Sequence, residues 1–266
     1  MKVFLVTDLE GVAGVINVCD YVYPESRYYE LAKELLTEET NAAIDGFFAA
    51  GADEIVVQDG HGQGGINILK LDPRAKLQRG WVGPHPFGLD DSYDVMAWVG
   101  QHPKAGTEYG HICHTGTHEV LDYTINGISV GEFGKIVFLG QLYNAVPIFA
   151  SGCLAFTKEA AALVEGIETV YVKEGVIPGK GDECSTEAYR ARNLGAIHMH
   201  PVVARKRIRE GAERALRRFL SDPESFRPTK IYPPYSKVVK IRPTNGKPGY
   251  VDEKTGYTDL AAIMNC

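Results

Sequence analysis

The chain has 266 residues, of which 44% are hydrophobic and 23% are charged, a composition typical of globular proteins. That length suits one large α/β domain, alone or with a small appendage. The formal net charge of −6 argues against a nucleic-acid partner, and no apolar stretch approaches the length of a membrane span. The N-terminal apolar run covers only Val3 to Val6, too short for a signal peptide, so we expect a cytoplasmic protein.

Cysteine usage argues against two further classes of protein. The five cysteines are an odd number, lie far apart and include no CxxC pair. A disulfide framework and a cysteine-based zinc ribbon are therefore not expected.

Short apolar runs alternate with helical segments through most of the chain. Strands are predicted at residues 2–7, 53–58, 94–100, 146–150 and 168–173. Helices are predicted at residues 26–50, from Glu132 to Tyr143 and from Thr157 to Val164. Short apolar strands that alternate with helices indicate an α/β fold whose mostly parallel or mixed sheet is covered on both faces.

The sequence changes character near residue 200. Residues 204–219 form a predicted amphipathic helix, residues 221–237 are rich in proline and polar side chains, and residues 238–242 form one predicted strand. We therefore predict an α/β domain over residues 1–199 that holds the functional site and a small C-terminal appendage over residues 200–266, packed on the same domain. The basic residues of the helix suggest a polyanion site, but the interleaved Glu210 and Glu213 favour a solvated helix face.

Five potential metal ligands follow predicted strands or short apolar runs. Asp8 and Glu10 follow the first strand, His61 the second and His102 the third, and Glu132 follows residues 128–131. In open α/β sheets, ligands bind beyond the carboxyl ends of the strands. We therefore expect these five side chains to converge.

The Asp8-Leu9-Glu10 spacing favours a cation. In an extended chain, side chains two residues apart project to the same face, and two carboxylates held side by side repel each other. Three carboxylates and two imidazoles exceed the needs of one tetrahedral zinc and suit two metals that share a ligand. Asp8 is the expected bridge, and the mixed nitrogen and oxygen donors favour two zinc ions per chain, with manganese or cobalt as alternatives.

A histidine-rich segment, residues 110–120, follows His102. It contains His111, His114 and His118, and an imidazole beside the metals would suit proton transfer or the stabilisation of an oxyanion. Spacing alone does not choose among the three.

Several ordered motifs resemble one known family, the zinc-dependent D-aminopeptidases of the dipeptide-transport-operon type (DppA-like). They are Thr7-Asp8-Leu9-Glu10-Gly11, the helical segment 28–48, Asp59-Gly60-His61, Gly100-Gln101-His102 and Asn126 through Val130-Gly131-Glu132-Phe133-Gly134. The family's catalytic histidine maps onto His114, with His111 as the alternative. The resemblance covers roughly residues 1–200.

The resemblance implies a three-layer α/β/α fold, a ring-shaped homodecamer and release of an N-terminal residue from short peptides, often a D-amino acid. In this reading Asp8 would bridge the two zinc ions, Glu10 and His102 would complete one, and His61 and Glu132 would complete the other. A water activated by these ions would attack the peptide carbonyl, with His114 as the acid/base or oxyanion-stabilising residue. The sequence does not define stereochemical preference. Other amidohydrolases and two-metal phosphoesterases would use similar ligands, but Lys104 and Lys135 are the only nearby cations for a phosphate.

Overall fold

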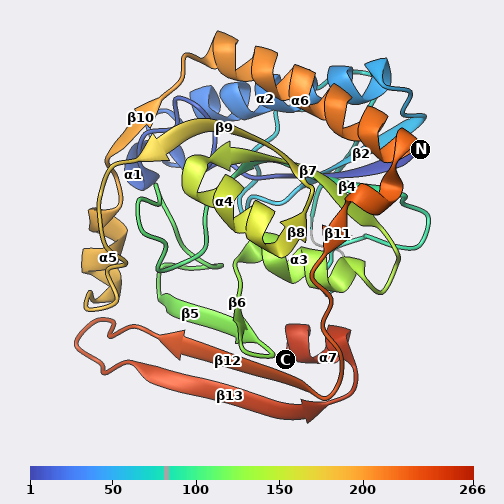
Figure 1. Ribbon diagram of the computed structural model, residues 1–266. Coiled ribbons are helices and arrows are strands. Elements are labelled where there is room, and N and C mark those ends of the chain that lie inside the picture. The colour runs from blue at the N-terminus through green and yellow to red at the C-terminus, as the bar shows by residue number, and fades with distance from the viewer. Residues whose placement is uncertain (81–83) are drawn as a thin grey trace.

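A seven-stranded sheet runs through the middle of the computed structural model, which describes residues 1–80 and 84–266 (Figure 1). The strand order is β10-β9-β7-β4-β1-β2-β3, and every neighbouring pair is parallel except β10 with β9. The strands are β1 (Lys2–Thr7), β2 (Glu54–Asp59), β3 (Lys76–Gln78), β4 (Val95–Gln101), β7 (Val146–Cys153), β9 (Glu168–Gly175) and β10 (Ala196–His198).

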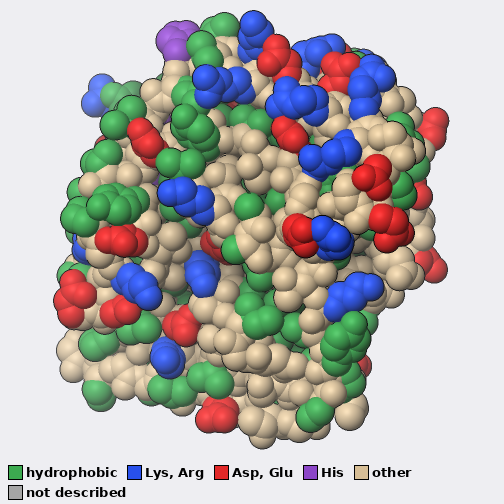
Figure 2. All heavy atoms as spheres, in the orientation of Figure 1, with side chains coloured by type: hydrophobic (Ala, Val, Ile, Leu, Met, Phe, Trp, Pro, Cys, Tyr) green, Lys and Arg blue, Asp and Glu red, His purple; other side chains and the backbone are tan. Residues whose placement is uncertain are grey.

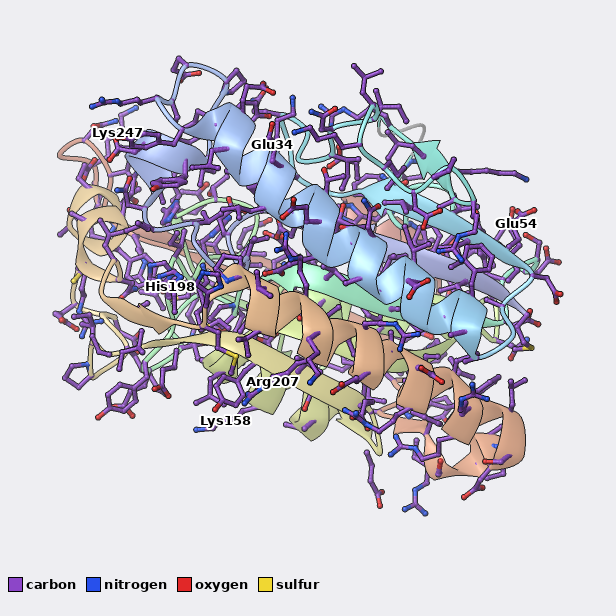
Figure 3. All side chains as sticks on the ribbon, turned by 90° about the horizontal axis from the view of Figure 1, so that it is seen from above. Glu34, Glu54, Lys158, His198, Arg207 and Lys247 are labelled. Carbon is purple, nitrogen blue, oxygen red and sulfur yellow. The ribbon has the colours of Figure 1, made fainter. Side chains whose placement is uncertain are left out.

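Helices cover both faces of this sheet. On one face α2 (Tyr29–Ala49) and α6 (Pro201–Ser221) lie side by side, as the view from above shows (Figure 3). On the other face lie α3 (Glu132–Gly140) and α4 (Leu154–Leu163) (Figure 1). The shorter helices are α1 (Val18–Tyr21), α5 (Thr186–Arg192), α7 (Leu260–Asn265) and the 3-10 helix η1 (Pro223–Ser225).

The core is divided in two by the sheet. Under α2 and α6, Phe47 packs edge-on against Phe149 with ring centroids 6.0 Å apart. On the opposite face the fully buried Trp98 packs edge-on against Phe133 of α3 at 4.6 Å. Burial on both faces explains why strand β4 is buried along its whole length and reads as a continuous apolar run.

A second, antiparallel sheet lies below the helices α3 and α4 in Figure 1. Its order is β13-β12-β5-β6, with β5 (Val120–Ile125), β6 (Ile128–Ser129), β12 (Tyr235–Ile241) and β13 (Tyr250–Tyr257). The tail therefore joins the middle of the chain, because β12 pairs with β5 from Lys237–Ile125 to Ile241–Val120. A two-stranded pair joins β8 (Val164–Glu165) and β11 (Arg227–Pro228).

The α/β class, the mostly parallel sheet and its two covered faces confirm the prediction from sequence. The division at residue 199 stays a prediction. The residues beyond it contribute α6 to one face of the large sheet and β12 and β13 to the small sheet.

The basic face of α6 is matched with acidic side chains. Arg209 pairs with Asp45 of α2 at 2.7 Å, and Arg217 pairs with Glu213 one helical turn away at 2.8 Å. In the space-filling view, Lys and Arg side chains alternate with Asp and Glu along this edge of the molecule (Figure 2). Among the described residues, no helix has the length and hydropathy needed to cross a membrane.

Candidate metal centre

The predicted ligands meet where three adjacent strands end. Strand β1 lies between β2 and β4, and its last residue, Thr7, is in register with Asp59 on one side and Val99 on the other. The chain passes from β1 to β2 and β3 on one side and then returns to β4 on the other. Such a reversal of strand order opens a crevice at the carboxyl ends of the strands, and the side chains that could hold metal ions lie there.

Two glycines allow the segments after β1 and β4 to approach closely. A Cβ at Gly11 would lie 2.2 Å from the Gln101 carbonyl oxygen, and a Cβ at Gly100 would lie 2.1 Å from that of Asp8. Gly100 also has a φ of +76°, which other residues rarely adopt. The close approach brings Asp8 and His102 into one site.

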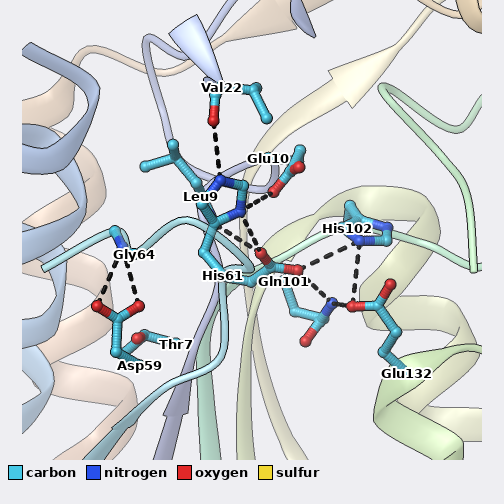
Figure 4. Close-up of polar contacts among 12 residues, drawn as sticks. Thr7, Leu9, Glu10, Val22, Asp59, His61, Gly64, Gln101, His102 and Glu132 are labelled. Atoms are coloured by element: carbon cyan, nitrogen blue, oxygen red, sulfur yellow. Dashed lines mark hydrogen bonds and ion pairs between the residues drawn. The ribbon is translucent and has the colours of Figure 1, made fainter. Parts of the chain in front are cut away.

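The first ligand group consists of Asp8, Glu10 and His61 (Figure 4). The Nδ1 atom of His61 lies 3.2 Å from Glu10 Oε2 and 3.4 Å from Asp8 Oδ1. The other ring nitrogen, Nε2, lies 2.9 Å from the carbonyl oxygen of Val22. Since a carbonyl only accepts, Nε2 carries the hydrogen and Nδ1 faces the carboxylates.

The second ligand group consists of His102, His114 and Glu132. His102 has the same arrangement as His61 with the roles of its two ring nitrogens exchanged. Its Nδ1 donates to the Pro103 carbonyl oxygen at 2.9 Å, and its Nε2 lies 3.5 Å from Glu132 Oε2. That Nε2 also lies 3.2 Å from Asp8 Oδ2. Asp8 thus faces one imidazole of each group with a different oxygen.

These residues fit a pair of divalent metal ions. The buried Glu10 Oε2 and His102 Nε2 atoms have no hydrogen-bond partner among the described residues. Each inward-facing imidazole nitrogen meets only carboxylate oxygens, so a proton or a cation must lie between them. Metal-binding histidines usually donate their second nitrogen to a carbonyl or carboxylate, as both do here.

Without metal, the imidazoles hold protons. Burial alone would lower the pKa of His61, but the charges of Glu10 and Asp8 raise it to about 12. Burial alone would also lower the pKa of His102, but the charges of Glu132 and Asp8 raise it well above its usual value. Burial would raise the pKa of Asp8, but His102 and His61 hold it well below its usual value.

The distances group the ligands differently from the pairing expected from sequence. That pairing set Glu10 with His102 and His61 with Glu132, around a bridging Asp8. In the structure Glu10 lies beside His61, and Glu132 lies beside His102. Strand order explains the difference. Strand β2, which precedes His61, lies on one side of β1, and β4, which precedes His102, lies on the other.

Gln101 was not expected to take part in the site. Its side-chain amide donates to Asp8 Oδ2 at 2.8 Å and to Glu132 Oε2 at 3.5 Å. It therefore links the carboxylate that follows β1 with the carboxylate at the first turn of α3. The sequence signal was its place between Gly100 and His102 at the end of β4.

The three histidines of segment 110–120 lie in different surroundings. His114 stacks on His102 with ring centroids 3.9 Å apart, and its Nε2 lies 3.8 Å from Glu132 Oε1. His118 stacks on the outer side of His114 at 4.6 Å. His111 instead contacts the Ile16 carbonyl oxygen at 2.9 Å and is in neither ligand group.

Two buried ionisable residues, Lys173 and Glu39, and the half-buried Glu159 support the loops that carry the ligands. Lys173 on β9 donates from Nζ to the carbonyl oxygens of Glu10 and Val15. Glu39 on α2 accepts from the Ala13 amide at 2.9 Å. Glu159 on α4 accepts from the Lys104 amide at 2.9 Å, two residues after His102. Sequence reasoning missed all three, because nothing local distinguishes them from other charged helix or strand residues.

A cavity of about 510 Å³ opens onto both ligand groups. Its walls include Asp8, Glu10, His61, His114 and Glu132. That volume lies in the range of small-molecule sites, and acidic side chains are part of its wall. The arrangement can hold divalent cations and present a neighbouring imidazole to a small substrate.

Comparisons with known proteins agree with this chemistry. A family model described as D-aminopeptidase, peptidase M55, matches residues 1–246. A D-aminopeptidase of Bacillus subtilis (strain 168) is 31% identical over 197 residues, which are 73% of this chain and 71% of that protein. A solved structure, the Zn-dependent D-aminopeptidase DppA from Bacillus subtilis, a self-compartmentalizing protease, has a TM-score of 0.82 at 23% identity and covers 99% of this chain and 96% of that one.

Proposed function

This chain belongs to the M55 peptidase family of D-aminopeptidases, and from that premise we propose that it releases an N-terminal D-residue from short peptides at the metal centre described above. The observation that carries the proposal is the orientation of His61 and His102. Each imidazole is fixed by a backbone carbonyl and turns its other nitrogen to carboxylates. This is a donor set for metal ions, and Asp8, Glu10, His61 and Glu132 of it line a cavity.

We propose zinc as the metal, with two ions per chain. The ligands are Asp8, Glu10, His61, His102 and Glu132, with Asp8 between the two ions. Support comes from the mixed nitrogen and oxygen donors, from the two groups of side chains and from the zinc dependence of the structurally similar Bacillus subtilis enzyme. Two such ions would lower the pKa of a water molecule and polarise the scissile carbonyl.

His114 is the proposed catalytic residue. Its Nδ1 donates to the Ile112 carbonyl oxygen at 3.0 Å, so its Nε2 keeps a lone pair. Burial and the charge of His102 lower the pKa of His114, which keeps the ring neutral near pH 7. A neutral imidazole at this position accepts a proton from the attacking water and returns it to the leaving amine.

The test combines metal analysis with a peptide screen. Purified protein is stripped with a chelator, reloaded with zinc, manganese or magnesium, and assayed on matched D- and L-dipeptides with free N-termini and on N-acetylated versions. We expect zinc to restore release of D-residues from the free peptides only. Cleavage of N-acetylated peptides at the same rate, or full activity after metal removal, would contradict the proposal.

A two-metal phosphoesterase has less support. Lys104, one of the two cations considered from sequence, lines a different cavity and donates from Nζ to the Ser129 carbonyl oxygen at 2.9 Å. Among the described residues, Lys135 is the only lysine or arginine in the wall of the metal-centre cavity. A phosphate monoester in the same screen separates the two functions.

We also propose that the chain forms a homo-oligomer, with a decamer as the specific expectation. The support is the self-compartmentalizing character of the Bacillus subtilis enzyme, which shares the fold. Light scattering at micromolar concentration measures the assembly directly. A monomer would rule out the ring, and a smaller oligomer would rule out the decamer alone.

A further inference from the structure

The metal-centre cavity has one lysine or arginine among its described wall residues, Lys135. Lys135 lies on α3, three residues after Glu132, so both project from the same side of that helix. The remaining charged wall residues are the carboxylates Asp8, Glu10 and Glu132. The wall of the cavity therefore combines three carboxylates of the proposed metal site with one lysine.

Within residues 1–80 and 84–266, the Lys135 ammonium forms no ion pair with a carboxylate. Among the described residues its contact is the Tyr123 ring, whose centroid lies 5.1 Å from Nζ. Burial lowers the pKa of Lys135, Glu132 opposes that effect, and Lys237 adds to it. Because Glu132 belongs to a proposed ligand group, its charge is committed to the metal. A half-buried cation with no anion of its own is an available anion site.

His85 lies close to Lys135 in the same cavity wall. Burial and the charge of Lys135 lower the pKa of His85 to about 4, so its ring is neutral near pH 7 and keeps one N–H donor. The ring lies against the Phe87 ring in a tilted arrangement with centroids 3.9 Å apart, and the His85 amide donates to Asn265 Oδ1 at 2.8 Å. A fixed neutral donor beside a cation suits a carboxylate.

The spacing along α3 matches a short peptide. Three helical residues advance about 4.5 Å, and one extended peptide residue spans about 3.3–3.6 Å. The offset between Glu132 and Lys135 thus corresponds to the one or two residues between a scissile carbonyl and a C-terminal carboxylate. A short peptide is a zwitterion, and its amine and carboxylate complement the acidic and basic parts of the cavity.

We propose that Lys135, assisted by His85, binds the C-terminal carboxylate of the substrate and thereby selects dipeptides and tripeptides with a free C-terminus. The proposal rests on the proposed function, since it places the N-terminal residue at the metal centre. It assigns Lys135 to substrate binding and not to the stabilisation of the reacting carbonyl.

The experiment uses D-alanylglycine, the smallest dipeptide with a D side chain and a free acid, and its C-terminal amide. With the zinc-loaded wild-type protein, we expect KM for the acid to be about tenfold or more below KM for the amide. Lys135→Met, which keeps the length and removes the charge, should raise KM for the acid to the value for the amide. The kcat values and the kinetics of the amide should change little, and Lys135→Arg should restore much of the preference.

Lys158→Met is the matched control, because Lys158 is an exposed lysine in the wall of the other cavity. Equal KM for acid and amide in the wild-type protein would overturn the proposal, and so would an equal fall in kcat for both substrates in Lys135→Met. The wild-type comparison needs no variant, so misfolding of Lys135→Met does not remove the test. If the wild-type protein cleaves neither peptide with zinc present, the proposed function fails as well.

Discussion

Asp8, Glu10 and His61 form the more enclosed of the two ligand groups. Their side chains are 7%, 6% and 7% exposed, and they follow two adjacent parallel strands. In the second group, the Glu132 side chain is 27% exposed, at the first turn of α3, and His114 lies in a loop. Both groups contribute side chains to the wall of the cavity, but the first has the more evenly buried ligands, whereas the second presents a partly exposed carboxylate and a loop histidine.

This difference suggests a division of tasks. The sheet and buried charges hold the enclosed group in place, which favours precise positioning of its ligand atoms over access for a substrate. The second group combines a ligand pair with the stacked imidazole of His114, which favours proton transfer. Asp8 belongs to both through its two oxygens, so substitutions at Asp8 and at residues of one group alone should have different consequences.

Replacement of Asp8 should have the largest effect. Asp8→Ala removes the carboxylate between His61 and His102, so we expect both metals to be lost and activity to be abolished, with the fold largely kept. Metal content by mass spectrometry and turnover on a D-dipeptide measure this directly. The exposed Asp91→Ala is a matched control. Two metals per chain and near-normal turnover in Asp8→Ala would refute a shared ligand.

Replacement of His114 should separate chemistry from metal binding. His114→Ala is expected to keep both metals and to lower kcat about 100- to 10,000-fold, or roughly 3–5 kcal/mol of barrier. KM should change much less. His118→Ala, which removes the outer ring of the same stack, should cost far less. Loss of a metal from His114→Ala would make His114 a ligand and pass the catalytic role to another residue.

The convergence of the ligands could be predicted from the sequence because the end of a buried strand can be recognised locally, where an apolar run stops. Asp8, His61 and His102 each follow an apolar run, and the topology of α/β sheets brings such positions together. The grouping of Glu10 with His61 was not predictable, because it depends on which strand lies on which side of β1.

The strand pairing of the C-terminal residues, 235–257, was likewise not predictable from the sequence. Strand β13 reads YVDEKTGY, a largely polar and exposed segment with no continuous apolar run to reveal it. Its partner β12 pairs with β5, more than a hundred residues earlier, and such long-range pairing leaves no pattern within either segment. The structural role of Lys173 was missed for the same reason, since its partners Glu10 and Val15 lie 163 and 158 residues earlier in the chain.

Metal binding should depend on pH. Without metal, the raised pKa values of His61 and His102 keep both rings protonated at neutral pH, and a metal must displace those protons. Apparent affinity should therefore fall as pH falls, by about tenfold per pH unit for each proton displaced. Calorimetry between pH 6 and pH 8, in two buffers of different ionisation enthalpy, measures the protons released. Affinity that is constant over this range would show that the imidazoles are not protonated competitors.

The smallest effect is expected from a residue that supports only the enclosed group. Lys173 is buried and holds the Glu10 carbonyl oxygen, and burial lowers its pKa to about 8. Lys173→Met keeps the bulk but removes the donors, so the loop that carries Glu10 loses its anchor. We expect metal affinity to weaken about 10- to 100-fold, with kcat largely recovered at saturating zinc. Glu159→Gln, which keeps an acceptor for the Lys104 amide beside the second group, should change affinity much less. A chelator competition assay measures both variants. A Lys173→Met protein with lower Tm but unchanged metal affinity would limit Lys173 to stability, and the two groups would then not differ in how they are held.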